Sequence, residues 1–331
     1  MFLLPSKNLT LTIPLVLLTG FLVGLQVDTS GLQKYILPVT ILMIYPTMIG
    51  FTLGEVLRPN NKRLLFSSLA INFIFIPLLA YVLGSLFLRH HPGLFAGLAV
   101  ASLLPTSNMT IAFTMFAGAN VAAAIQLTVV GLITGSLLAP WYLLVMVGKY
   151  IPVDVLTVLK TLTMVVILPL IMGTLTYRLL LRKYTPEEFQ AKFKPYLPAA
   201  TAWGAIYIIF TSISTNAHRI VDNIEMIILV ALLVQLLFYA INYLGVIQFS
   251  RYFFNRRDGI TLVYGTALRN LSISIGLAAT AFGADAALMV SLAFLIQGQA
   301  AAWYLRFIQR KAVIGEYCQS GREIEGRLKA R

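Results

Sequence analysis

The chain has 331 residues, of which 59% are hydrophobic and only 11% are charged, whereas an average soluble domain is roughly 45–50% apolar and about 25% charged. A soluble core of this size could not bury so much apolar surface, so the composition excludes a soluble protein and predicts an all-α membrane protein. The net charge of +13 would suggest a nucleic-acid partner in a soluble protein. This protein is expected to have the lipid bilayer as its partner, and in a membrane protein the net positive charge mainly indicates the orientation. No nucleic-acid partner is expected.

Ten hydrophobic runs predict ten membrane-spanning helices, since each is long enough to cross a hydrocarbon layer of about 30 Å. They cover residues 10–27, 36–57, 64–88, 94–116, 121–147, 155–181, 196–215, 224–249, 260–282 and 286–307. The first run lacks a small-x-small cleavage pattern after Val27 and is therefore expected to be a retained span. The breaks between the runs are short and turn-like, so no soluble domain is expected.

Basic residues are distributed very unequally between the two sides that ten spans define. The side that carries both termini has nineteen Lys and Arg residues, whereas the opposite side has four, Lys34, Arg89, Lys149 and Arg219. The positive-inside rule therefore predicts a multi-pass protein of the plasma membrane with both termini in the cytoplasm. Residues 313–331 would form a basic cytoplasmic tail, and because the one cysteine, Cys318, lies there, no disulfide is expected.

An internal repeat divides the ten spans into two halves. Asn108 precedes Trp141 by 33 residues, and Asn270 precedes Trp303 by the same 33 residues. Between them each half has a turn of the same kind, Gly118-Ala119-Asn120 and Gly283-Ala284-Asp285. The spacing predicts two five-helix repeats over 1–150 and 151–312, and an odd number of spans means that they are inverted relative to each other.

Two polar runs predict that the fourth and ninth spans are broken and cross each other. TSNMT begins at Thr106, directly after Pro105, and RNLSIS begins at Arg269. Proline removes a backbone donor, and irregular backbone at membrane depth is tolerated only against protein or a cavity. Facing half-helix ends bind ions or small polar solutes. The alternative is that these Ser, Thr and Asn side chains only form hydrogen bonds between helices.

Arg269 is the most informative single residue. Lys160 is the other basic residue inside a span, and it can extend to the outer interface. Arg269 lies near the middle of its span, where a charge costs at least ~2.5–3.5 kcal/mol. The one acid within a span, Glu55, is close to Arg58 near a helix end. We therefore expect Arg269 to contact the carbonyl ends of the broken helices, Asn108 or Asn270, or an anionic solute.

Other intramembrane polar residues are expected to contribute mainly to packing: Asn72, Gln126, Thr128, Gln235, Asn242, Gln297 and Gln299. His90, His91 and His218 lie in external loops without Cys or acid neighbours at ligand spacing, so no metal site is predicted. The chain has no P-loop, nucleophile elbow, HExxH or paired Asp motif. An ATP-driven pump or an intramembrane enzyme is therefore not expected.

Taken in order, these motifs resemble the bile acid/sodium symporter superfamily. The resemblance rests on the Pro-Thr-Ser-Asn run of the fourth span, NFIFIP at 72–77 in the third, the Arg-Asn run of the ninth, and the repeat. The fourth span and IYPTM at 44–48 are most similar to the arsenite efflux carriers of the arsenical-resistance branch. The resemblance implies a core domain of spans 3–5 and 8–10 that moves against a panel domain of spans 1, 2, 6 and 7.

The resemblance also implies positions for ion and solute ligands. In the sodium-coupled members, a Ser-Asn pair, a Thr and a Gln hold sodium together with a Glu and a Gln-Asn pair of the ninth span. The matching residues here are Ser107, Asn108, Thr128, Asn72, Gly265, Arg269 and Asn270. The Glu is thus replaced by Gly265 and the Gln by Arg269. The arsenite carriers have a Cys in the fourth span and a Glu in the ninth, where this chain has Thr106 and Ser272.

The sequence therefore predicts a secondary transporter that moves a small anionic solute by alternating access. The predicted binding residues around the break at Pro105 are Asn72, Thr106, Ser107, Asn108, Thr110, Thr128, Arg269, Asn270 and Ser272. Arsenite or antimonite efflux is the first alternative, and a channel or a non-transporting sensor is the second. No cofactor is expected, and sodium or proton coupling, the direction of transport and the oligomeric state stay open.

Overall fold

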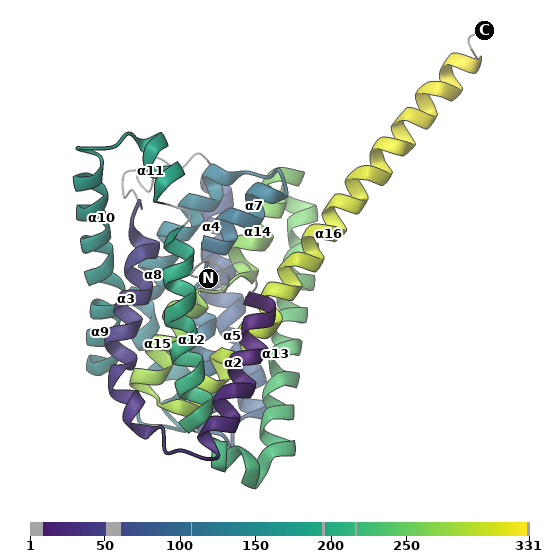
Figure 1. Ribbon diagram of the computed structural model, residues 1–331. Coiled ribbons are helices and arrows are strands. Elements are labelled where there is room, and N and C mark those ends of the chain that lie inside the picture. The colour runs from purple at the N-terminus through teal and green to yellow at the C-terminus, as the bar shows by residue number, and fades with distance from the viewer. Residues whose placement is uncertain (1–8, 51–60, 107, 194–195, 216, 330–331) are drawn as a thin grey trace.

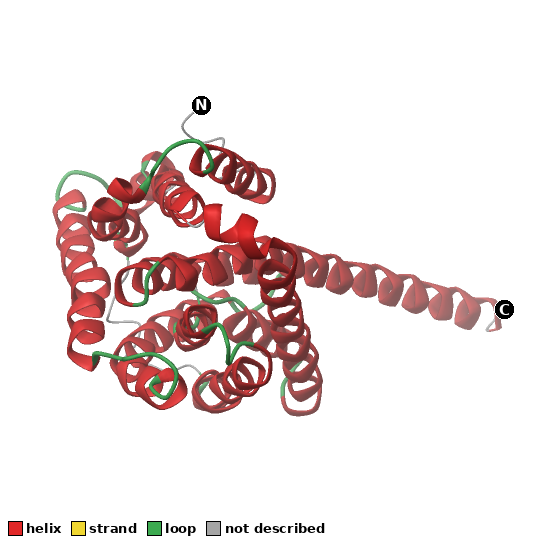
Figure 2. Ribbon diagram, turned by 90° about the horizontal axis from the view of Figure 1, so that it is seen from below, coloured by secondary structure: helices red, strands yellow, loops and turns green. Residues whose placement is uncertain are grey.

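A computed structural model describes residues 9–50, 61–106, 108–193, 196–215 and 217–329 of the chain. Helices make up almost all of this part, and the described residues contain no strand, only one isolated β-bridge. Figure 2 shows the resulting bundle of helices and the long last helix that leaves it. The predicted class, an all-α membrane protein, is confirmed.

The helices of the first half pass up and down the bundle (Figure 1). In chain order they are α2 (Leu9–Gly24), the short 3-10 turn η1 (Ser30–Tyr35), α3 (Ile36–Met48), α4 (Lys62–Ala70), the π-helical turn η3 (Ile71–Phe75), α5 (Ile76–Phe87), α6 (Pro92–Leu103), α7 (Asn108–Phe116) and α8 (Val121–Val147). The second half of the predicted second span, with Glu55, lies outside the described residues.

The second half contains α9 (Val155–Leu162), the π-helical turn η4 (Thr163–Ile167), α10 (Leu168–Leu180), α11 (Pro186–Lys192), α12 (Leu197–Thr215), α13 (Ala217–Phe253), α14 (Arg256–Ala267), α15 (Leu271–Ala281) and α16 (Ala284–Lys329). In the described residues five continuous helical segments are long and apolar enough to cross a membrane: Lys62–Phe87, Val121–Val147, Val155–Leu180, Ile228–Phe253 and Ala284–Arg310. The fourth and ninth predicted spans are each divided into two shorter helices.

Two predicted boundaries are wrong, and the residues predicted as a tail continue the last helix. The expected turn at 216–223 is helical from Ala217, because α13 continues well beyond its apolar segment. The expected loop at 182–195 contains α11, which Thr185 and Glu188 start with a reciprocal capping box. The last helix extends through the expected tail to Lys329 and projects from the bundle (Figure 1).

The helices form two groups, which are in contact through α15 and also where α12 and α2 pack on α16. In the first group α12 packs on α2 and α3, and α3 packs on α10. In the second group α6 packs on α5, α8 and α16, and α13 packs on α14. Figure 1 shows α3, α9 and α10 on one side of the bundle and α13 on the other. Since α15 contacts both α16 and α3, it lies at the boundary between the groups.

Glycines allow the close approach of helices within and between these groups. A Cβ at Gly97 would lie 2.3 Å from the carbonyl oxygen of Ala286, and a Cβ at Gly276 of α15 would lie 2.1 Å from Cγ2 of Thr40 in α3. Small residues at such crossings are typical of membrane helices, where van der Waals contact replaces the hydrophobic effect as the cause of association.

A single carboxylate joins three helix beginnings at one end of the second group. Asn61, Asn120 and Asn255 are the N-caps of α4, α8 and α14, and each uses its Oδ1 to accept a backbone N–H of its own helix. Their Nδ2 groups all donate to Asp258, at 2.9, 2.8 and 3.0 Å respectively. Asp258 is 7% exposed, and these amides replace the water that its carboxylate loses on burial.

We expect Asp258→Ala to lower the free energy of unfolding by about 3 kcal/mol, because three amide groups lose a charged acceptor. The measurement is denaturant unfolding in detergent micelles. Asp154→Ala is the matched control, since Asp154 also caps a helix but is solvent-exposed. An equal loss of stability in both variants would show that the Asp258 carboxylate does not join the three helices.

Candidate functional site

Two helix breaks lie directly against each other in the middle of the bundle. The first separates α6 from α7, and the second separates α14 from α15. The backbone N–H of Thr106 donates to the carbonyl of Leu268 at 2.9 Å, and the N–H of Asn270 donates to the carbonyl of Leu104 at 2.8 Å. These bonds form an antiparallel bridge between Pro105 and Arg269. The predicted breaks are confirmed, and each satisfies the backbone groups that the other exposes.

Thr106 has a strained backbone in the first break. Its φ is 61°, a left-handed conformation that is rare for a β-branched residue. Its side chain is fully buried and its hydroxyl donates to the carbonyl of Pro105 at 2.7 Å and contacts that of Thr128 at 3.3 Å. Such strain costs about 1–3 kcal/mol and persists only where the surroundings enforce it. Here the bridge to the second break enforces it.

Arg269 is fully buried, and its guanidinium is surrounded by oxygen acceptors of the protein. Nε donates to the carbonyl of Ala101 at 3.2 Å, NH2 donates to the carbonyl of Ser102, and NH1 donates to the carbonyl of Thr266 at 3.0 Å. NH1 also donates to Oδ1 of Asn72 at 2.5 Å. The expected contact of the guanidinium with the carbonyl ends of the broken helices is therefore confirmed.

Asn72 is aimed at the guanidinium by an irregular turn. It lies in the π-helical turn η3, and its Nδ2 donates to the carbonyl of Gly265 at 3.1 Å, so the amide is held at both ends. In a regular helix the carbonyl of Phe73 would accept the N–H of residue 77, but Pro77 has no N–H. The hydroxyl of Tyr142 on α8 donates to that carbonyl instead, at 2.6 Å. Such single π turns are frequent at functional sites.

Gln297 of α16 fixes the backbone of Arg269. Its Oε1 accepts the Arg269 N–H at 2.7 Å and its Nε2 donates to the Arg269 carbonyl at 3.1 Å. The hydroxyl of Tyr239 on α13 donates to the same Oε1 at 2.9 Å. Gln297 was expected to contribute to packing, and no sequence signal relates it to Arg269, because 28 residues separate them along the chain.

The other predicted site residues divide into buried and accessible ones. Thr110 and Thr128 are buried, and the hydroxyl of Thr128 donates to the carbonyl of Ala124 within its own helix. Asn270 and Ser272, at the beginning of α15, are partly exposed. The backbone of Asn108 begins α7, whereas its side chain and all of Ser107 lie outside the described residues.

The four helix ends at the crossing carry unequal charge. The carbonyl ends of α6 and α14 have a partial negative charge, and the guanidinium of Arg269 binds both of them. The beginnings of α7 and α15 have a partial positive charge. The described residues place no carboxylate in contact with either beginning, where Asn270 caps α15 with its neutral amide. The crossing is therefore positive on its accessible side, a field that attracts anions.

Comparison with known proteins identifies relatives of this chain. The model of the Sodium Bile acid symporter family matches residues 10–223, well over half of the chain. A protein of Arabidopsis thaliana, "Probable sodium/metabolite cotransporter BASS5, chloroplastic", is 25% identical over 254 residues, which are 71% of this chain and 60% of that protein. The protein YbaS of Bacillus subtilis is 24% identical over 241 residues, 72% of this chain and 76% of that protein.

Two features of these matches bear on the site. The chain spans less than two thirds of the length of the Arabidopsis protein. The family match ends at residue 223 and thus before α14, α15 and Arg269. The first break lies inside the matched residues and the second lies outside them. Neither relative's name refers to arsenite, so membership of the arsenite branch stays a prediction.

We expect Arg269→Met to lower the free energy of unfolding by about 3–5 kcal/mol, because four buried oxygen acceptors lose their donor. Lys160→Met, which removes the other basic residue inside a span, should change it little because Lys160 is exposed. Unfolding of both variants in detergent measures the difference. Equal stability of the two variants would contradict a structural role of the guanidinium.

Proposed function

Because the chain belongs to the sodium bile acid symporter family, we propose that it is a secondary membrane transporter whose solute binds where the two helix breaks cross. One observation carries this proposal: four half-helix ends meet there, and Arg269 neutralises only the two negative ones. Half-helix ends at the middle of a membrane are typical solute and ion sites of transporters.

The charge at the crossing favours an anionic solute. The guanidinium of Arg269 is fully buried and already uses four of its five N–H donors on Asn72 and three carbonyls, so we assign it an indirect role. It cancels the negative ends of α6 and α14 and leaves the positive beginnings of α7 and α15 for the solute. Asn270 and Ser272 would then contact the solute, since both are polar and partly exposed there.

Alternating access would be a movement between the two helix groups. One contact between them, Gly276 of α15 against Thr40 of α3, is made by small residues, and such a contact can slide with little steric resistance. The site lies on α15, at this boundary, so it would move with the second group. We propose that both termini lie in the cytoplasm of a plasma membrane, and the unequal distribution of basic residues supports this orientation.

The alternatives have less support. Arsenite binds thiolates, and the one cysteine of this chain, Cys318, lies near the end of α16, far along the chain from both breaks. A channel would need a continuous water path, and the crossing backbones are bonded directly to each other. Transport that saturates with solute concentration would distinguish a transporter from a channel or a sensor.

Asn270→Asp tests the anionic solute without removing a helix cap. Aspartate caps α15 as well as asparagine does, but it places a negative charge at the proposed site. We expect uptake of organic anions into proteoliposomes to fall about tenfold or more, because repulsion of about 1.4 kcal/mol already has this effect. Asn270→Ser keeps an uncharged cap and should retain uptake. Equal uptake by both variants would contradict the proposed site.

Sodium is the coupling ion that the names of the family and of the Arabidopsis relative suggest. We infer that the oxygens around Arg269 are not a sodium site in this chain, because the guanidinium occupies the space between them.

Removing the guanidinium in Arg269→Met would leave Asn72 Oδ1 and three carbonyls as ligands suited to a hard cation. We therefore expect sodium to raise the unfolding temperature of this variant more than that of the native protein, with potassium chloride as the control. An equal shift would contradict the inference.

A further inference from the structure

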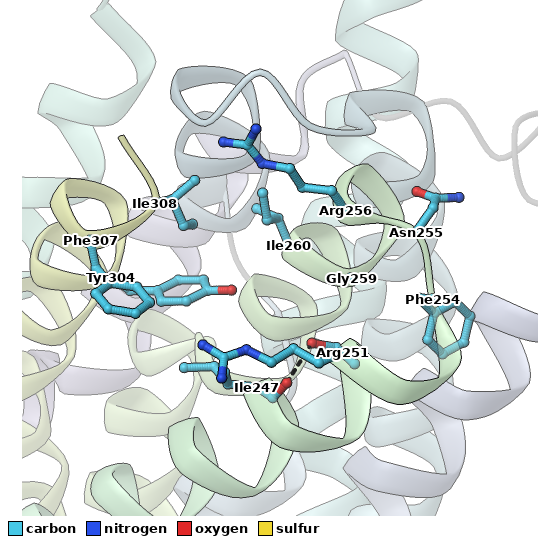
Figure 3. A pocket seen from close by; sticks show the side chains of 11 residues that line it. Ile247, Arg251, Phe254, Asn255, Arg256, Gly259, Ile260, Tyr304, Phe307 and Ile308 are labelled. Atoms are coloured by element: carbon cyan, nitrogen blue, oxygen red, sulfur yellow. Dashed lines mark hydrogen bonds between the residues drawn. The ribbon is translucent and has the colours of Figure 1, made fainter. Parts of the chain in front are cut away.

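A cavity of about 180 Å³ lies between α13, α14 and α16 (Figure 3), and the residues that line it are not those of the helix crossing. The end of α13 contributes Arg251, and the beginning of α14 contributes Arg256 and Ile260. Phe307 and Ile308 of α16 line the opposite side. The cavity is therefore an apolar groove with two guanidinium groups at its rim, a combination that the proposed transport cycle does not use.

The two arginines have no anionic partner in the described part of the chain. Both are exposed, and Lys192–Glu188 is the one ion pair found among the described residues. The acid closest to them in sequence, Asp258, accepts three asparagine amides on its carboxylate. Arg256 is also the first residue of α14, whose N-terminal dipole adds a partial positive charge. The rim of the groove thus attracts an anion.

The groove lies where hydrocarbon gives way to lipid headgroups. Arg251 is in the last turn of the apolar segment Ile228–Phe253, and the apolar segment of α16 ends at Arg310. Large hydrophobic side chains are exposed at this level, with Phe253 49%, Phe307 44% and Trp303 67% exposed. Aromatic residues of this kind are enriched where membrane and water meet. A lipid between α13 and α16 would reach the groove from the membrane.

We propose that this groove binds an anionic phospholipid. Arg251 and Arg256 contact its phosphate, and Ile260, Phe307 and Ile308 pack against its glycerol and the first methylene groups. A free phosphate ion would satisfy the two charges but would leave the apolar walls without a partner. Basic pockets between membrane helices on the positive side are known to select anionic headgroups.

Quenching of Trp303, one turn from Phe307, tests this assignment at the groove itself. The protein has three tryptophans, so Trp141→Phe and Trp203→Phe leave Trp303 as the only tryptophan, which is excited selectively at wavelengths that tyrosine does not absorb. The protein is reconstituted with phosphatidylglycerol and phosphatidylcholine, and either one or the other is brominated on its acyl chains. We expect brominated phosphatidylglycerol to quench Trp303 more strongly than brominated phosphatidylcholine at the same mole fraction.

Arg251→Gln with Arg256→Gln should lower this preference about tenfold or more, since each basic residue near an anionic surface contributes roughly 1 kcal/mol. Arg251→Lys with Arg256→Lys should retain most of it. Arg178→Gln with Arg182→Gln, the same charge change at the end of α10 and in the turn after it, should leave it unchanged. Equal quenching by both lipids, or an unchanged preference in the glutamine variant, would overturn the proposal. Loss of the preference in millimolar glycerol phosphate would also overturn it, in favour of a soluble phosphate ligand.

Discussion

The guanidinium of Arg269 is the interaction on which the centre of the protein depends. Two helices are interrupted at the same depth, and their carbonyl ends would repel each other in an apolar interior. Arg269 binds both ends and Asn72, while Gln297 fixes its backbone. The backbone bridge between Pro105 and Arg269 then aligns the two breaks. The strained Thr106 and the crossing are thus both stabilised by the same buried cation.

The second group of helices buries a charge of each sign, and in the described residues each one is stabilised by dipoles. Arg269 is surrounded by carbonyl oxygens at helix ends, whereas Asp258 is surrounded by amide N–H groups at helix beginnings. Arg269 therefore joins helices through carbonyls at their ends, and Asp258 joins helices through the side-chain amides of their N-cap asparagines. A buried ion pair would join only two side chains. Its two charges would both lose their water, and this desolvation can cost more free energy than their attraction provides.

This arrangement separates the structural charge from the proposed solute site. Arg269 is fully buried, with four of its five N–H donors bonded to the protein, and the partly exposed polar groups, Asn270 and Ser272, are neutral. A solute at the beginnings of α7 and α15 would meet dipoles whose positive sign the guanidinium preserves by cancelling the opposite ends. The groove at Arg251 and Arg256 differs from the crossing, because its two cations are exposed and lie beside apolar side chains.

The sequence by itself determined the membrane class, the breaks at Pro105 and Arg269, the turns at Gly118 and Gly283, and the need of Arg269 for partners at membrane depth. Those conclusions depend on composition, on local backbone chemistry and on the free-energy cost of placing one charge inside a membrane. All three can be judged from short stretches of the chain. Only the tertiary structure decided which partners these are. Asn72, Ser102, Thr266 and Gln297 come from four different helices, and their convergence depends on how those helices pack, which no local pattern encodes. For the same reason Asp258, an ordinary loop acid in the sequence, became the group that joins three helix beginnings.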